Sequence, residues 1–115
     1  MQISTIVGVN MELTDAITQY AEERATSLEK YTSHIEPAVQ MRIEVGKTTN
    51  HHAKGPYFRA EFILSIPGDT LRAEVIGEDL YQAIDDAKDE IKRQLLDIKE
   101  KYVDQEKRVV RPGKE

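Results

Sequence analysis

The stretch "GEDLYQAIDDAKDEIKRQL", residues 77–95, decides the fold. Asp79 stands three positions before Gln82, a capping-box pattern that predicts the start of a helix. Beyond this start, apolar residues recur at steps of 4, 3, 4, 4, 3 and 4. This spacing places them on one helical stripe, which we expect to pack against a sheet. The stripe contains Leu80, Ile84, Ala87, Ile91, Leu95, Ile98 and Tyr102.

The stretches that come earlier predict four strands and one further helix. Alternating apolar residues favour strands at 2–10, 38–47, 57–66 and 70–77. The first strand is expected to place Ile3, Thr5, Val7 and Val9 on one face, and the turn at residues 67–69 predicts a hairpin. Thr14 is a suitable N-cap for a helix that keeps its apolar spacing to about His34.

The element order is therefore β-α-β-β-β-α, in the α+β class. Each strand has one apolar face and each helix one apolar stripe. We expect a four-stranded sheet with both helices packed on one face, an architecture like that of the double-stranded-RNA-binding domain. The other face would carry cross-strand charge pairs. Residues 1–102 form the expected domain, and residues 103–115 a basic, flexible C-terminal tail.

Composition excludes several classes of protein. The chain has 115 residues, a formal net charge of −5 and no cysteine, which removes disulfides and thiolate catalysis. No apolar run approaches the ~18 residues of a membrane span, and the first ten residues are unlike a signal peptide. We expect a cytoplasmic protein that is a monomer when free.

No catalytic or metal centre can be assembled from the sequence. The "GKT" at residues 46–48 resembles the end of a phosphate-binding loop, but Met41 stands where that loop requires glycine. His51 and His52 are adjacent, without the spaced partners that a zinc site needs. We therefore expect no enzyme activity, no cofactor, no metal and no small-molecule substrate.

Basic charge gathers at the C-terminal end of this acidic chain. Residues 1–35, 36–87 and 88–115 carry net charges of −3, −4 and +2. At 100° per residue, Lys88, Lys92 and Lys99 flank one edge of the apolar stripe, while Arg93 projects farther round. Two interpretations stay open: a solvated helix face, or a surface for an anionic partner such as phosphate.

Residues 77–95 resemble the signature of the ribosome hibernation promoting factors, also called the ribosome-associated translation inhibitor or protein Y family. The stretches "ELTDAI" and "LEKY" also fall where that family has similar residues. The resemblance covers about residues 1–100 and includes the order of the elements. The matching positions are Asp79, Tyr81, Ala83, Ile84, Asp85, Arg93, Gln94 and Leu95.

The resemblance implies a translation inhibitor that occupies the mRNA and A/P-site tRNA channel of the small ribosomal subunit in stress or stationary phase. Its partners would be ribosomal RNA and neighbouring ribosomal proteins. Basic side chains on the two helices would contact RNA phosphates, giving recognition of shape and charge. The candidate RNA-binding residues are Arg24, Lys30, Lys88, Lys92, Arg93 and Lys99, with further tail contacts from Lys107, Arg108 and Arg111.

This chain departs from the family pattern where relatives commonly have basic residues. Thr18, Ser27, Glu90 and Asp97 stand at these positions, which bears on affinity more than on fold. The longer relatives carry a second domain, so the chain resembles a short form. The alternative hypothesis is an acidic protein-interaction module that regulates a transcription or stress-response partner through its sheet edge or face.

Overall fold

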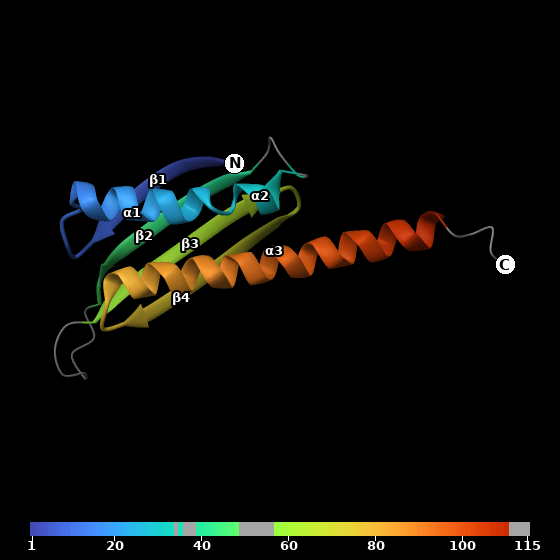
Figure 1. The fold of residues 1–115 in the computed structure, drawn as a ribbon. Coiled ribbons are helices and arrows are strands. Elements are labelled where there is room, and N and C mark those ends of the chain that lie inside the picture. The colour runs from blue at the N-terminus through green and yellow to red at the C-terminus, as the bar shows by residue number, and fades with distance from the viewer. Residues whose placement is uncertain (34, 36–38, 49–56, 111–115) are drawn as a thin grey trace.

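The computed structural model describes residues 1–33, 35, 39–48 and 57–110, with residues 100–110 described by their backbone only. A four-stranded sheet in the order β1-β2-β3-β4 carries the helices on one face (Figure 1). β1 is parallel to β2, and the other neighbours are antiparallel, which confirms the expected α+β architecture. The elements are β1 (Gln2–Val9), α1 (Asp15–Thr26), α2 (Glu29–Thr32), β2 (Gln40–Lys47), β3 (Phe58–Ile66), β4 (Asp69–Gly77) and α3 (Leu80–Val110).

The core lies between the sheet and the helix layer. From the sheet, Met41, Phe62 and Leu64 are fully buried, and Ile84 and Ile91 of α3 are fully buried against it. The apolar stripe of α3 is thus confirmed as the packing face as far as Leu95, and Ile98 is partly buried. Burial of such side chains contributes roughly 1.5–3 kcal/mol each, so this stripe fixes α3 to the sheet.

The expected alternation of β1 is interrupted by a β-bulge. Ile3 pairs with Met41 but Thr5 pairs with Arg42, which leaves Ser4 as an extra residue. The Ser4 hydroxyl donates a hydrogen bond to the Met41 carbonyl at 3.0 Å. The bulge reverses the faces beyond it, so Ile3 and Ile6 pack on the core. The prediction of a single face was therefore wrong: Thr5, Val7 and Val9 have partners on the open face, Arg42, Glu44 and Gly46.

The helix expected from Thr14 to about His34 is divided into α1 and the one-turn α2. The Thr14 side chain accepts a hydrogen bond from the Ile17 N–H at 3.1 Å, which confirms the N-cap. At the break, the Ser27 hydroxyl donates to the Arg24 carbonyl at 2.6 Å. The Leu28 N–H bonds to a carbonyl three residues earlier. Such local bonds compete with the α-helical pattern and change the direction of the chain.

α3 begins as predicted and ends later than predicted. Asp79 Oδ1 accepts hydrogen bonds from the N–H groups of Tyr81 and Gln82, at 2.9 and 3.3 Å. The Gln82 amide donates to Asp86, so only half of the capping box forms. The helical backbone continues past Tyr102 to Val110, because no glycine or proline occurs before Pro112. Residues 103–110 are thus helical where an aperiodic tail was expected, and 111–115 lie outside the described residues.

The hairpin between β3 and β4 forms where the sequence predicted a turn. Ile66 pairs with Asp69, and Pro67 and Gly68 connect the strands. Gly68 has a φ of 81°, a left-handed conformation that glycine adopts without a steric penalty. Proline followed by such a glycine suits a type II turn and fixes the register of the sheet's last pair of strands.

Candidate nucleic-acid interface

The charged side chains on the open face of the sheet form ion pairs with one another. The Arg59 guanidinium lies at the centre, 3.3 Å from Glu44 and 2.7 Å from Glu61, and it also pairs with Glu74. Arg42 pairs with Glu44 at 3.1 Å, and Arg72 approaches Glu61 at 3.5 Å. The expected cross-strand pairs are therefore present. Three arginines and three glutamates balance, and this network offers no surplus charge to a partner.

The protonation of this network follows from its hydrogen bonds. The bond from Arg42, together with that from Arg59, outweighs burial and holds the pKa of Glu44 below its usual value. The bond to Glu74 likewise raises the pKa of Arg59 despite burial. Each charge stabilises its partners in the ionised state.

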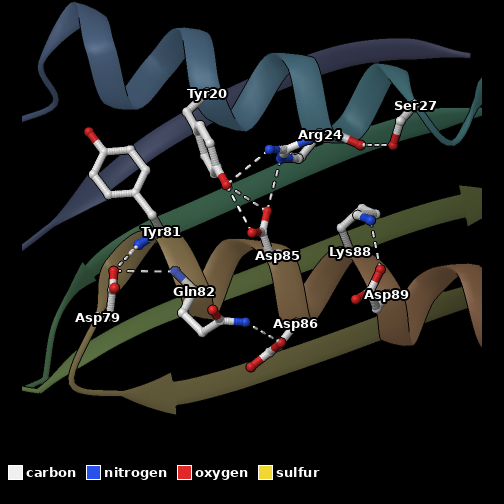
Figure 2. Close-up of polar contacts among 10 residues, drawn as sticks. All are labelled: Tyr20, Arg24, Ser27, Asp79, Tyr81, Gln82, Asp85, Asp86, Lys88 and Asp89. Atoms are coloured by element: carbon white, nitrogen blue, oxygen red, sulfur yellow. Dashed lines mark hydrogen bonds and ion pairs between the residues drawn. The ribbon is translucent and has the colours of Figure 1, made fainter.

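The helix layer brings α1 and α3 side by side through a polar cluster (Figure 2). The Tyr20 hydroxyl donates to the Asp85 carboxylate, whose oxygens lie 2.8 and 2.9 Å away. Arg24 lies over the Tyr20 ring, 4.6 Å from its centroid, and its Nε is 2.9 Å from Asp85. The Tyr81 ring meets the Tyr20 ring edge-on at 4.7 Å. The positive charge of Arg24 is thus held by a carboxylate of the neighbouring helix.

Lys88 and Arg93 also face carboxylates. Lys88 Nζ is 2.6 Å from Asp89. Arg93 pairs with Glu90 at 2.5 Å and with Asp97 at 2.9 Å, so both acidic departures from the family pattern contact it. The bonds from Arg93 and Gln94 lower the pKa of Glu90 to about 2. A shallow groove beside Arg93 is lined by Asp89, Lys92, Arg93 and Leu96.

Lys30 and Lys92 meet at one aromatic ring. Lys30 Nζ lies 5.3 Å from the centroid of the Tyr31 ring, and Lys92 Nζ lies 5.5 Å from it. Burial raises the pKa of the Tyr31 phenol, but the ammonium groups of Lys92 and Lys30 outweigh it and hold the pKa below its ordinary value. Within the described part of the chain, neither lysine forms an ion pair.

The structure thus groups the candidate cations by their neighbours. Arg24 comes from α1, Lys30 from α2, and the other four from α3, in one helix layer (Figure 1). Arg24, Lys88 and Arg93 contact carboxylates, whereas Lys30 and Lys92 contact Tyr31. Lys99 is exposed farther along α3. The side chains of Lys107 and Arg108, and all of Arg111, lie outside the described residues.

Most residues of the α3 signature support the fold rather than the surface. Asp79 caps the helix, and Ala83, Ile84 and Leu95 are buried in the core. Asp85 joins α3 to α1, and the Gln94 amide donates to the Arg72 carbonyl of β4 at 2.9 Å. Three signature residues are exposed, namely Asp79, Tyr81 and Arg93, and of these Asp79 is used as the helix cap. The signature therefore identifies the fold directly and a binding surface only indirectly.

The search for a metal centre gives no candidate among the described residues. No group of three or more histidine, cysteine, aspartate or glutamate side chains there could hold a metal ion. His34, His51 and His52 lie outside the described residues, so the prediction about them stays a prediction. None of the helices described is both long and apolar enough to cross a membrane.

Comparison with protein families places this fold among ribosome-associated proteins. A family model described as "Sigma 54 modulation protein / S30EA ribosomal protein" matches residues 4–103. The Ribosome hibernation promotion factor of Deinococcus radiodurans is 36% identical over 105 residues, which is 91% of this chain and 53% of that protein. The Ribosome hibernation promoting factor of Azotobacter vinelandii is 32% identical over 106 residues, which is 92% of this chain and 90% of that protein.

Solved structures agree on the architecture. The N-terminal domain of Protein Y from Thermus thermophilus matches with a TM-score of 0.68 and 30% identity, covering 83% of this chain and 96% of that domain. A ribosomal subunit interface protein from Coxiella burnetii matches with a TM-score of 0.62 over 86% of this chain and 98% of that one. At 18% identity, the second match shows the fold alone. This chain spans about half of the D. radiodurans relative.

Proposed function

The chain belongs to the Sigma 54 modulation protein / S30EA ribosomal protein family, and we propose on this basis that it is a ribosome-binding translation inhibitor. In this proposal it occupies the mRNA and A/P-site tRNA channel of the small subunit and keeps idle ribosomes inactive in stress or stationary phase. It acts in the cytoplasm, as a monomer when free, by occlusion rather than catalysis.

One observation carries the proposal: a helix layer with basic groups from three helices on a domain that is acidic overall. The formal net charge of −5 would repel RNA if it were spread evenly. Cations from α1, α2 and α3 lie instead in one layer on one side of the sheet (Figure 1). The docking surface consists of Arg24, Lys30, Lys88, Lys92, Arg93 and Lys99, and the terminal segment adds Lys107, Arg108 and Arg111.

The chemistry of this surface suits phosphate contacts. Ammonium and guanidinium groups neutralise RNA phosphates and release condensed counterions, which gives affinity without base readout. A rigid α+β platform that presents these groups would recognise the shape of a ribosomal RNA channel. The protein would then exclude mRNA and tRNA simply by filling the space that they use.

The test is cosedimentation with purified small ribosomal subunits across a salt series, combined with cell-free translation. Wild-type protein should bind, inhibit translation, and lose affinity steeply as salt rises. The double variant Lys92→Glu, Arg93→Glu should dissociate from the subunits and restore translation. Its thermal unfolding midpoint should be almost unchanged, because Arg93 is exposed, Lys92 is only half-buried, and neither belongs to the core.

The matched control is Lys47→Glu, at the exposed end of β2, which should behave like wild type. If the double variant still inhibits translation at the wild-type concentration, the docking surface lies elsewhere. Binding that is insensitive to salt would favour the alternative of a protein-interaction module.

A further inference from the structure

We propose that Lys30, Tyr31 and Lys92 form a single phosphate-binding site at the junction of α2 and α3, and that this site is the principal electrostatic contact of the docking surface. The ligand, a backbone phosphate of RNA, follows from the proposed function. The site itself follows from the convergence of two lysines on one tyrosine ring, 5.3 and 5.5 Å from its centroid.

The geometry brings two positive charges to one aromatic ring. Each ammonium group lies within the ~6 Å range over which a cation is attracted to an aromatic face. The two groups nevertheless repel each other, and no carboxylate among the described side chains pairs with either. An anion bound between them would offset that repulsion. The phenolic O–H of Tyr31 supplies a further donor at the same place.

The platform beneath the site is rigid. Tyr31 is partly buried and packs against the core. Leu28, three residues before Tyr31, and Thr32, the next residue, are fully buried, and the Thr32 hydroxyl donates to the Glu29 carbonyl at 3.1 Å. Lys92 lies one residue after the fully buried Ile91. Because both helices are fixed to the core at this point, the backbone positions of the two lysines are set before a ligand arrives, which lowers the entropic cost of binding.

The other cations are less available to a phosphate. Arg24, Lys88 and Arg93 already face carboxylates at 2.9, 2.6 and 2.5 Å. A phosphate would have to compete with these intramolecular partners, and Arg93 has a second one in Asp97. Lys99 contacts no second cation or ring within the described part of α3. The candidate residues therefore differ in how strongly each can bind a phosphate, and the two lysines at Tyr31 should contribute most to the affinity for RNA.

The test measures affinity for purified small ribosomal subunits at several KCl concentrations, by cosedimentation of the full chain. Lys30→Gln and Lys92→Gln should each weaken binding by about 5–10-fold. Because both lysines contact one phosphate, the fold-loss of affinity in the double variant should be smaller than the product of the fold-losses in the two single variants. The double variant should also reduce the salt slope by about one unit.

Matched variants distinguish a specific effect of this site from the general effect of removing one positive charge. Lys88→Gln and Arg93→Gln remove the same charge from the same helix, but they should weaken binding by about 2-fold or less, because their side chains have intramolecular partners. Tyr31→Phe keeps the ring and removes the phenolic donor, so it should give a loss of about 2–3-fold. Thermal unfolding checks that each variant is folded.

The possible results distinguish the two proposals. If the wild-type protein does not bind small subunits at low salt, the proposed function fails. If the wild type binds, but Lys88→Gln or Arg93→Gln weakens binding as much as Lys92→Gln, the site at Tyr31 is wrong and the proposed function stands. Losses that multiply fully in the Lys30→Gln, Lys92→Gln double variant would also overturn a single shared site.

Discussion

The two faces of the domain differ in whether their basic side chains have acidic partners. On the open face of the sheet, Arg59 sits among three glutamates, and every arginine of the network has a partner on a neighbouring or the same strand. In the helix layer, Lys30 and Lys92 share an aromatic ring and contact no carboxylate among the described residues. A count of charges would make both faces look equally able to bind a partner.

The difference shows that partners within the fold, rather than numbers of basic residues, decide where charge is available. On the open face Glu44, Glu61 and Glu74 lie directly opposite one another. Arg59 and Arg72 reach these glutamates from diagonal positions on neighbouring strands, so the regular spacing of the sheet neutralises their charge. The junction of the one-turn α2 with α3 has no such regular pairing. We therefore expect mutations on the open face to change stability, and mutations near Tyr31 to change binding.

The largest effect should come from the core that both faces share. Phe62 is fully buried beneath the helices. Phe62→Ala should lower the free energy of unfolding by about 3–5 kcal/mol, because it removes a large buried ring and leaves a cavity. Urea denaturation measures this change. A loss below ~1 kcal/mol would mean that the helix layer does not depend on this part of the sheet.

A smaller effect on stability alone should follow from Arg59→Gln. The Arg59 side chain is 23% exposed, and its loss leaves three glutamates without their common partner. We expect a loss of about 1–2 kcal/mol in the free energy of unfolding and no change in affinity for small subunits. The two readouts are urea denaturation and cosedimentation. Weaker ribosome binding by a folded variant would contradict the separation of the two faces.

The same network predicts how stability depends on pH. The pKa of Glu44 is lower in the folded chain than its ordinary value of 4.5. Its contribution to stability is therefore complete above that value and is lost as the pH falls through the lower folded pKa. Urea denaturation between pH 6 and pH 3 should show a shallower acid dependence in Arg59→Gln than in wild type, because the folded pKa of Glu44 moves back toward 4.5.

The smallest effect should come from Glu90→Gln, which releases Arg93 from one of its partners. Affinity for small subunits should rise by about 2–3-fold, because a neutral side chain no longer competes with phosphate. The stability that Glu90 contributes is present above its ordinary pKa of 4.5 and is lost only as the pH falls through about 2. Cosedimentation measures the affinity, with Glu12→Gln on the exposed loop before α1 as the control for net charge. An equal rise in both variants would mean that net charge alone governs binding.

Much of the fold could be predicted from the sequence because its signals are periodic. The stripe from Leu80 to Leu95 and the Asp79 cap are short-range patterns, and the structure confirms them. The bulge at Ser4 could not be read from alternation, because it depends on the Ser4 hydroxyl reaching the Met41 carbonyl across the sheet. The break at Ser27 likewise depends on a side-chain bond that competes with the helix.

The sequence predicts which basic residues belong to the candidate site, but not which side chains each of them contacts. Helical azimuth placed Lys88 and Lys92 on the same edge of α3, yet their neighbours differ: Asp89 for one and Tyr31 for the other. In the sequence Tyr31 is simply the last residue of the "LEKY" stretch, with nothing to indicate a contact with a lysine of α3. Its role depends on where α2 turns after Ser27, which is a tertiary feature. Helical spacing on α3 and the family resemblance together indicated the candidate cations, and their neighbours in the structure separate those with a carboxylate partner from those without one.

One matched pair of double variants tests the contrast between the two faces most directly. Lys30→Gln with Lys92→Gln, and Arg42→Gln with Arg72→Gln, each remove two positive charges, the first pair from the helix layer and the second from the open face. The measurement is the slope of affinity for small ribosomal subunits against salt concentration. The account predicts a slope reduced by about one unit for the helix-layer pair and an unchanged slope for the open-face pair. Equal reductions in both, or a reduction confined to the open-face pair, would contradict it.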